Sequence, residues 1–138
     1  MTPARAVLIV AIVVYLACMP LDAFCVGDKC SDWQGWGILA FGGMLLASAD
    51  SNIVWLANPI LFLAWIMVLL NRRLVAVLLS LGALVIGLAF LSFKSVVTNE
   101  GGIQMPITGY KAGYWVWLAS MGVTAVSALL IRPEQARQ

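Results

Sequence analysis

The chain contains no histidine and carries little charge. Only 10% of its 138 residues are Asp, Glu, Lys or Arg, whereas a soluble domain has about 25%. Without histidine it cannot bind haem or a metal through imidazole, and it has no imidazole for acid-base catalysis. Its net charge of +2 is too small and too scattered for nucleic-acid binding. These absences exclude a nucleic-acid partner, and they lead us to expect neither catalysis nor a cofactor.

Hydrophobic residues make up 63% of the chain and occur in long runs. A helix needs about 20 mainly apolar residues to cross a bilayer. Four runs approach this length and are bounded by charged or capping residues: 3–19, 53–70, 74–93 and 113–131. Only Asn71-Arg72-Arg73 separates the second run from the third, which predicts a tight antiparallel hairpin. The sequence therefore predicts an all-α membrane protein, with one domain of four transmembrane helices covering residues 1–138.

A fifth apolar stretch, residues 36–49, is too short for a crossing. Glycine is a poor helix former, and four glycines lie in or beside this stretch: Gly35, Gly37, Gly42 and Gly43. We expect a short interfacial or re-entrant helix on the outer face, within an outer loop of residues 20–52. The second outer loop, residues 94–112, is expected to be a connector, with a mobile flap as the alternative.

The charged residues sort by side if the chain crosses four times. The inner side then receives Arg5, Arg72, Arg73, Arg132 and Arg137, and the outer side receives Lys29, Lys94 and Lys111 together with Asp22, Asp28, Asp32, Asp50 and Glu100. The positive-inside rule therefore places both termini and the tail, residues 132–138, in the cytoplasm. The first run also resembles a signal peptide, but we expect it to remain as an anchor. The compact pattern favours a bacterial inner membrane.

Two cysteines lie close together in the first outer loop. Gly27-Asp28 can form a turn between Cys25 and Cys30, so we expect a structural disulfide on the periplasmic or extracellular side. A redox-active pair is the alternative, although membrane thiol oxidoreductases use a Cys-x-x-Cys spacing and a second pair. A zinc site with Asp28 and Asp32 lacks a second Cys/His pair, so no metal is expected.

Aromatic residues gather at the predicted outer membrane surface. Six of them fall there: Trp33, Trp36, Tyr110, Tyr114, Trp115 and Trp117. Such residues usually anchor helices at the lipid headgroups. Alternatively, the clusters from the two loops meet and form a docking surface, or a groove for a lipid or quinone. The sequence leaves both interpretations open.

Polar groups are scarce within the predicted crossings, and none at their centres is ionisable. Asp50 should cap the second crossing. Pro59 lacks a backbone N–H and should kink that helix near the carbonyl of Trp55. Asn58, with Asp50, is a candidate polar niche for a ligand.

These observations predict a small non-enzymatic membrane protein that acts through protein contacts. It would be an accessory subunit, an assembly factor or an immunity-type protein, and its disulfide-braced, aromatic-rich outer face would bind another membrane or secreted protein amid membrane lipids. The alternative is an oligomeric transporter or channel for ions or small solutes. Small residues on the third helix, Ala76, Ser80, Ala83 and Gly87, would allow close packing within the bundle or against another protein.

Overall fold

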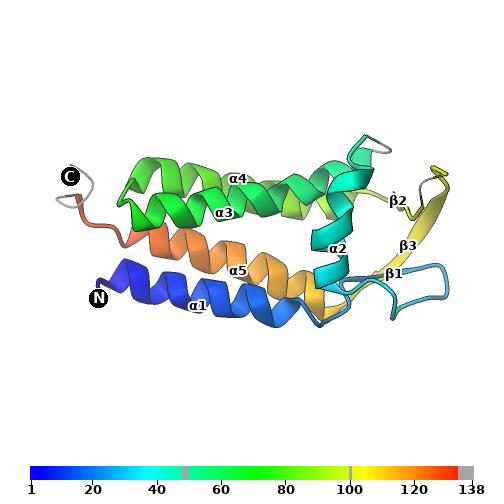
Figure 1. Cartoon of the computed structure of the whole chain (residues 1–138), viewed down its shortest axis with the longest axis horizontal. Helices are drawn as coiled ribbons and strands as arrows, with labels where there is room; N and C mark the ends of the chain where they lie inside the picture. The colour runs from blue at the N-terminus through cyan, green and yellow to red at the C-terminus, as the bar shows by residue number, and fades with distance from the viewer. Residues whose placement is uncertain (48–49, 100, 134–138) are drawn as a thin grey trace.

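Four long helices form a bundle in the computed structural model, which describes residues 1–47, 50–99 and 101–133 (Figure 1). They are α1 (Pro3–Cys18), α3 (Ala57–Leu69), α4 (Arg73–Ala89) and α5 (Ala112–Leu129). A 3-10 helix, Asp50–Leu56, leads into α3, and a 3-10 turn, Phe90–Ser92, extends α4. Thr2 caps α1 because its side-chain oxygen accepts a hydrogen bond from the backbone N–H of Arg5, and Pro3 occupies the first helical position.

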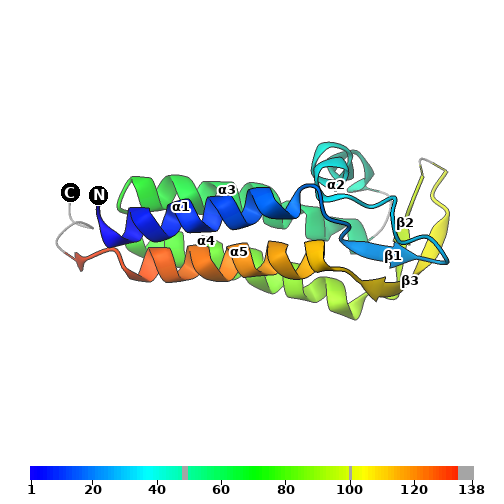
Figure 2. The same ribbon diagram turned by 90° about the horizontal axis from the view of Figure 1, so that it is seen from below.

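The helices alternate in direction, so α1 begins and α5 ends at the same end of the bundle (Figure 2). At this terminal end the Ser127 hydroxyl donates to the carbonyl of Ala4 at 2.7 Å. The predicted hairpin between α3 and α4 is also here. Asn71 takes a left-handed φ of 57°, while Asn71 and Arg72 donate to carbonyls in the last turn of α3, which is a Schellman ending.

Three of the helical segments are long and apolar enough to cross a membrane: Asp50–Leu69, Arg73–Ser92 and Ala112–Leu129. Their ends lie within three residues of the predicted ones. The fourth, α1, has 16 residues and is apolar but shorter. Apolar run length therefore located these helices correctly.

The small residues of α4 face the interior of the bundle. Ala76, Ser80, Ala83 and Gly87 are all buried. A Cβ atom on Gly87 would lie 2.8 Å from the Leu118 side chain, so this glycine permits the close approach of α5. The stripe therefore serves packing within the bundle.

The expectation of an all-α fold is correct only in part: the chain is mostly helical, but three antiparallel strands lie beyond the bundle. β1 (Phe24–Val26), β3 (Gln104–Tyr110) and β2 (Ser95–Val97) form a small sheet in that order. The loop predicted as a connector is largely the hairpin of β2 and β3. Its β-branched residues, including Val96, Val97 and Ile107, favour extended backbone. Glu100, which lies between these strands, is outside the described residues.

The fifth apolar stretch forms α2 (Gly35–Phe41) and a 3-10 helix, Gly42–Leu45, which runs across the end of the bundle (Figure 1). Two of its glycines, Gly35 and Gly42, are required for close packing. A Cβ on Gly35 would lie 2.7 Å from the carbonyl oxygen of Cys18, and one on Gly42 would overlap the Trp55 indole. Residues 48 and 49 lie outside the described part. We call α2, this 3-10 helix, the three strands and their connecting loops the cap.

The junction between cap and bundle gives a first prediction. A Cβ on Gly113 would lie 2.7 Å from the Asp22 carbonyl oxygen, whereas one on Gly122 of the same helix meets no atom within 4 Å. We expect Gly113→Ala to lower the free energy of unfolding by about 1–3 kcal/mol through overpacking. The matched control Gly122→Ala should leave it unchanged or raise it by up to about 1 kcal/mol. Reversible unfolding in mixed micelles measures both, and equal stabilities would contradict this account of the junction.

Candidate functional site: the cap and its cavity

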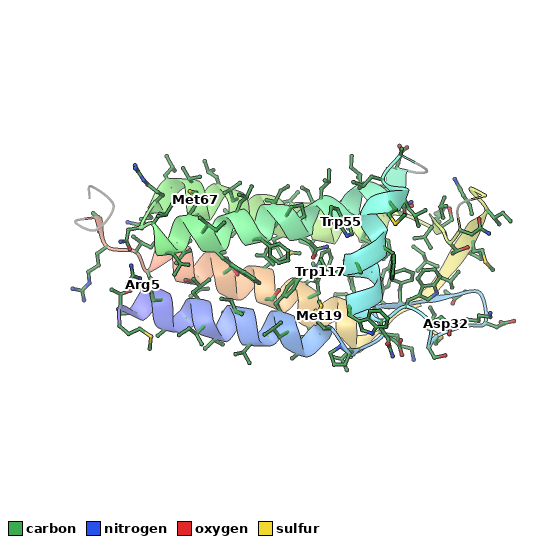
Figure 3. The ribbon with its side chains drawn as sticks, viewed as in Figure 1. Arg5, Met19, Asp32, Trp55, Met67 and Trp117 are labelled. Carbon is green, nitrogen blue, oxygen red and sulfur yellow. A yellow bond between two sulfur atoms is a disulfide. The ribbon has the colours of Figure 1, made fainter. Side chains whose placement is uncertain are left out.

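A cavity of about 580 Å³ lies between α2 and the adjoining end of the bundle. Its volume is in the range of ligand pockets, about 300–1,000 Å³. The lining comes from α1, α2, the start of α3, the start of α5 and β2, and it is mainly apolar and aromatic. Figure 3 shows three lining residues, Met19, Trp55 and Trp117, close to α2.

The two predicted aromatic clusters meet in the structure. Trp33, Trp36, Tyr114 and Trp117 all line the cavity. Tyr110 and Trp115 stand just outside it, with ring centroids 5.0 and 5.1 Å from that of Tyr114. The residues predicted from both loops are therefore parts of one aromatic assembly.

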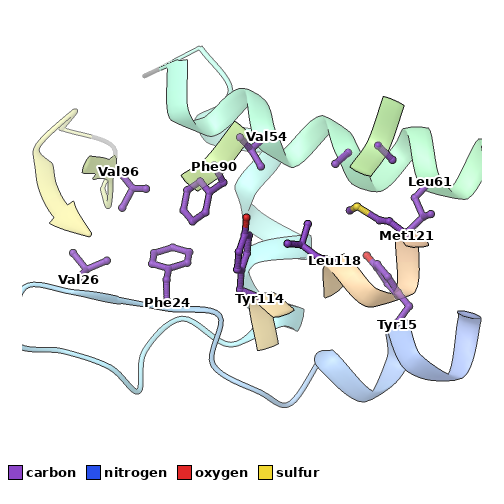
Figure 4. Packing of buried hydrophobic residues seen from close by; sticks show 12 residues of the cluster. Tyr15, Phe24, Val26, Val54, Leu61, Phe90, Val96, Tyr114, Leu118 and Met121 are labelled. Carbon is purple, nitrogen blue, oxygen red and sulfur yellow. The ribbon is translucent and has the colours of Figure 1, made fainter. Parts of the chain in front are cut away.

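Two phenylalanines that sequence reasoning missed connect the clusters. Phe24 stacks on Trp33 with ring centroids 5.4 Å apart, and it contacts Phe90 at 5.3 Å. Phe90 contacts Tyr114 in turn, at 5.8 Å (Figure 4). Phe24 directly precedes Cys25 and Phe90 directly follows α4, so their positions at loop boundaries were the only available signal.

The six predicted aromatic residues differ in exposure. Trp36 and Trp115 are 56% and 50% exposed, but Tyr114 is 2% exposed and is therefore part of the core. The Tyr114 hydroxyl donates to the Gly87 carbonyl at 2.8 Å. Tyr110 donates to the Phe90 carbonyl at 3.2 Å, and burial raises the pKa of its phenol, so this donor keeps its proton at neutral pH. Tyr114 thus supports the wall of the cavity from within the core and adds almost nothing to the exposed surface.

Asn58 joins three helices at the inner end of the cavity. Its Oδ1 accepts hydrogen bonds from the Tyr15 hydroxyl of α1 at 3.0 Å and from the Trp117 indole N–H of α5 at 2.9 Å. Its Nδ2 donates to the carbonyl of Trp55 at 3.1 Å. Because Pro59 has no N–H to give to that carbonyl, the neighbouring amide takes over as donor. Sequence reasoning selected Asn58 but missed Tyr15.

The structure separates the two members of the predicted polar niche. Asn58 is 5% exposed, whereas Asp50 is exposed at the first residue of the 3-10 helix and does not line the cavity. Pro59 stands in the first turn of α3, just after the change from 3-10 to α-helix. The niche consists of Asn58 with Tyr15 and Trp117.

Cys25 and Cys30 form the predicted disulfide, with an S–S distance of 2.12 Å. The turn between them is the predicted one: Gly27 has a positive φ of 56°, and Val26 and Lys29 exchange backbone hydrogen bonds at 2.9 and 3.0 Å. In residues 1–47, 50–99 and 101–133, no three His, Cys, Asp or Glu side chains gather as a possible metal site. The disulfide closes residues 25–30 into a short loop, which begins in β1 and lies beside the cavity.

A second hollow of about 380 Å³ adjoins the cavity and shares Asp32, Trp33 and Thr98 with it. Asp28 and Lys29 also line this hollow. The Lys29 ammonium and the Asp32 carboxylate lie 3.9 Å apart and are both well exposed, so they form only a weak ion pair. The cap thus places a mainly apolar cavity next to a hollow that three exposed charged side chains help to line.

Comparison with known proteins found no match: no protein-family model, no curated protein and no solved structure matches the chain.

The hydrogen bonds of Asn58 give a second prediction. Asn58→Ala leaves the Tyr15 hydroxyl, the Trp117 indole N–H and the Trp55 carbonyl without their partner, and each such loss costs about 1–3 kcal/mol when the group stays buried. We expect a loss of unfolding free energy of several kcal/mol on this basis, measured in mixed micelles. Tyr15→Phe removes one donor while Asn58 keeps Trp117, so it should cost clearly less. Equal costs would show that the three bonds do not act through Asn58.

Proposed function

We propose that the chain is an integral membrane protein with four transmembrane helices: α1, α3 with its preceding 3-10 helix, α4 and α5. The distribution of side chains supports this. On α4, Leu78, Leu81 and Val85 are exposed while smaller residues are buried. An apolar surface of this extent is unfavourable in water, but lipid covers it at no such cost.

The placement of charge supports an orientation with the terminal end in the cytoplasm. The arginines of the described chain lie at the terminal end: Arg5, Arg72, Arg73 and Arg132. The lysines and aspartates lie in the cap or next to it: Lys29, Lys94, Lys111, Asp22, Asp28, Asp32 and Asp50. This asymmetry follows the positive-inside rule. Arg137 and Glu100 lie outside the described residues. The cap would then face the periplasm of a bacterial inner membrane or the cell exterior.

In this arrangement α2 lies at the membrane surface. Residues 33–47 contain no charge, and Trp36, Phe41 and Met44 are exposed. Such a helix suits the boundary between headgroups and acyl chains. Helix α1 has a length of about 24 Å, and a bilayer adapts to so short a helix by local thinning.

We further propose that the protein is not an enzyme and acts by binding another membrane or secreted protein through its cap. The observation that carries this proposal is the tip of the β2–β3 hairpin. Ile103, just before β3, and Met105, on β3, are exposed there. The hairpin itself lies beyond the ends of the long helices (Figure 1). Exposed apolar side chains outside the lipid layer are typical of protein contacts.

Cysteine labelling in spheroplasts tests the topology, which is the third prediction. In a background with Cys18, Cys25 and Cys30 replaced by Ser, single cysteines are placed by Ser31→Cys in the cap and Asn71→Cys at the terminal end. We expect a membrane-impermeant maleimide to label the cap position at once and the other only after lysis. Labelling of both positions in sealed spheroplasts would contradict four crossings with this orientation.

Purification of tagged protein from its native membranes tests the partner role, which is the fourth prediction. We expect a stoichiometric partner with the unaltered chain and with the control variant Leu78→Ala/Val85→Ala on the lipid-facing side of α4. Recovery should fall about tenfold or more in Ile103→Ser/Met105→Ser, because apolar anchors dominate binding energy. Recovery of a homo-oligomer alone would favour the transporter or channel instead, which flux assays in liposomes would then test.

A further inference from the structure

The cavity beneath α2 is mainly apolar, and a single charged residue of the described chain lines it. This residue, Asp32, lies at the border with the second hollow. The inner wall is built from uncharged side chains, including Cys18, Leu39 and Val54. A hydrocarbon chain suits such a wall, because a charged or strongly polar ligand would lose its hydration there without compensation.

Part-buried hydrogen bonds hold two of the indole rings around this space. The Trp55 N–H donates to the Leu39 carbonyl at 3.1 Å and the Trp117 N–H to Asn58 at 2.9 Å. Each ring would have to give up its bond to turn into the cavity. The cavity is therefore preformed, which lowers the ordering cost of binding.

The adjoining hollow is also partly apolar, with Val26, Trp33 and Met105 in its lining, but exposed charged side chains line it as well. Lys29, Asp28 and Asp32 are its charged lining residues within the described chain. One cation with two carboxylates suits a ligand that carries an ammonium group together with a phosphate, and it disfavours a purely anionic headgroup. A quinone, which carries no charge, would leave this hollow unused.

We propose that the two hollows together bind one phospholipid with an ammonium-bearing, zwitterionic headgroup such as phosphoethanolamine. One acyl chain occupies the cavity between α2 and Asn58, and the headgroup lies against Asp28, Lys29 and Asp32. This inference rests on the proposed membrane location, in which α2 lies at the depth where headgroups and acyl chains meet. Trp36 and Phe41, which line the cavity and are exposed, connect it with the surrounding lipid.

Photo-crosslinking in vesicles tests the proposal. The protein is reconstituted with phosphatidylethanolamine or phosphatidylglycerol that carries a diazirine in one acyl chain, and mass spectrometry locates the labelled residues. We expect the phosphatidylethanolamine probe to label cavity residues such as Leu39, Val54 and Trp117. Labelling there should be about tenfold weaker with phosphatidylglycerol, which corresponds to about 1.4 kcal/mol.

A pair of glycine variants supplies the control. Gly37 lines the cavity and Gly82 lies on α4 away from it, and a Cβ at either meets no atom within 4 Å. Gly37→Trp should reduce cavity labelling about tenfold by occupying the space, whereas Gly82→Trp should leave it unchanged. Thermal unfolding of both variants verifies that they fold.

The possible outcomes separate this inference from the membrane proposal. If the probe labels Leu78, Leu81 and Val85 on the exposed face of α4 but no cavity residue, the lipid site is wrong while the membrane location stands. If it labels none of these residues, the membrane location itself is wrong. Equal cavity labelling by the two probes would overturn the headgroup assignment. Because the unaltered chain gives these results, they hold even if the Gly37 variant fails to fold.

Discussion

The hydrogen bonds of one asparagine determine how the helices of this protein meet. Pro59 cannot supply the N–H that the Trp55 carbonyl needs, and a buried carbonyl without a partner costs about 1–3 kcal/mol. The Asn58 amide satisfies that carbonyl, and its own oxygen then requires donors, which Tyr15 and Trp117 provide. The rotation of α1 and of α5 about their axes is thereby fixed relative to α3. In the proposed bilayer, water cannot replace these hydrogen bonds. Uncharged side chains therefore hold the helices together, a role that ion pairs often have in soluble proteins.

The junction between the 3-10 helix Asp50–Leu56 and α3 also shapes the cavity. Trp55 presents its carbonyl to Asn58 and its indole ring to Gly42 and Gly43 of the cap, while the indole N–H binds Leu39. Trp117 is at once a donor to Asn58 and part of the cavity wall. The wall is therefore supported by the hydrogen bonds that hold the bundle together. A binding site supported in this way keeps its shape without a ligand.

The sequence predicted what depends on neighbouring residues and missed what depends on distant ones. Apolar run length located the helices, and Gly27-Asp28 indicated the disulfide turn, because both signals lie within a few residues. The sheet pairs Phe24 with Tyr110 across most of the chain, and no local pattern identifies such a partner. The glycines of residues 94–112 favoured a loop, so the strand tendency of the β-branched residues around Val96 and Ile107 was not recognised. Tyr15 was missed because its helix is apolar on every side, so no stripe indicated which face turns inward.

The glycines of the cap explain why the cap depends on the bundle. Each glycine lowers helix propensity by about 1 kcal/mol, so the seven residues of α2 have little tendency to form a helix alone. Close packing against the bundle stabilises α2 instead. Gly35 allows it to approach the backbone of α1, and Gly42 and Gly43 allow the following 3-10 helix to lie against Trp55. Its position therefore follows from the end of the bundle beneath it. A change at Asn58 that moves Trp55 should move α2 and the cavity as well, so the stability of the bundle and the shape of the cap are physically coupled.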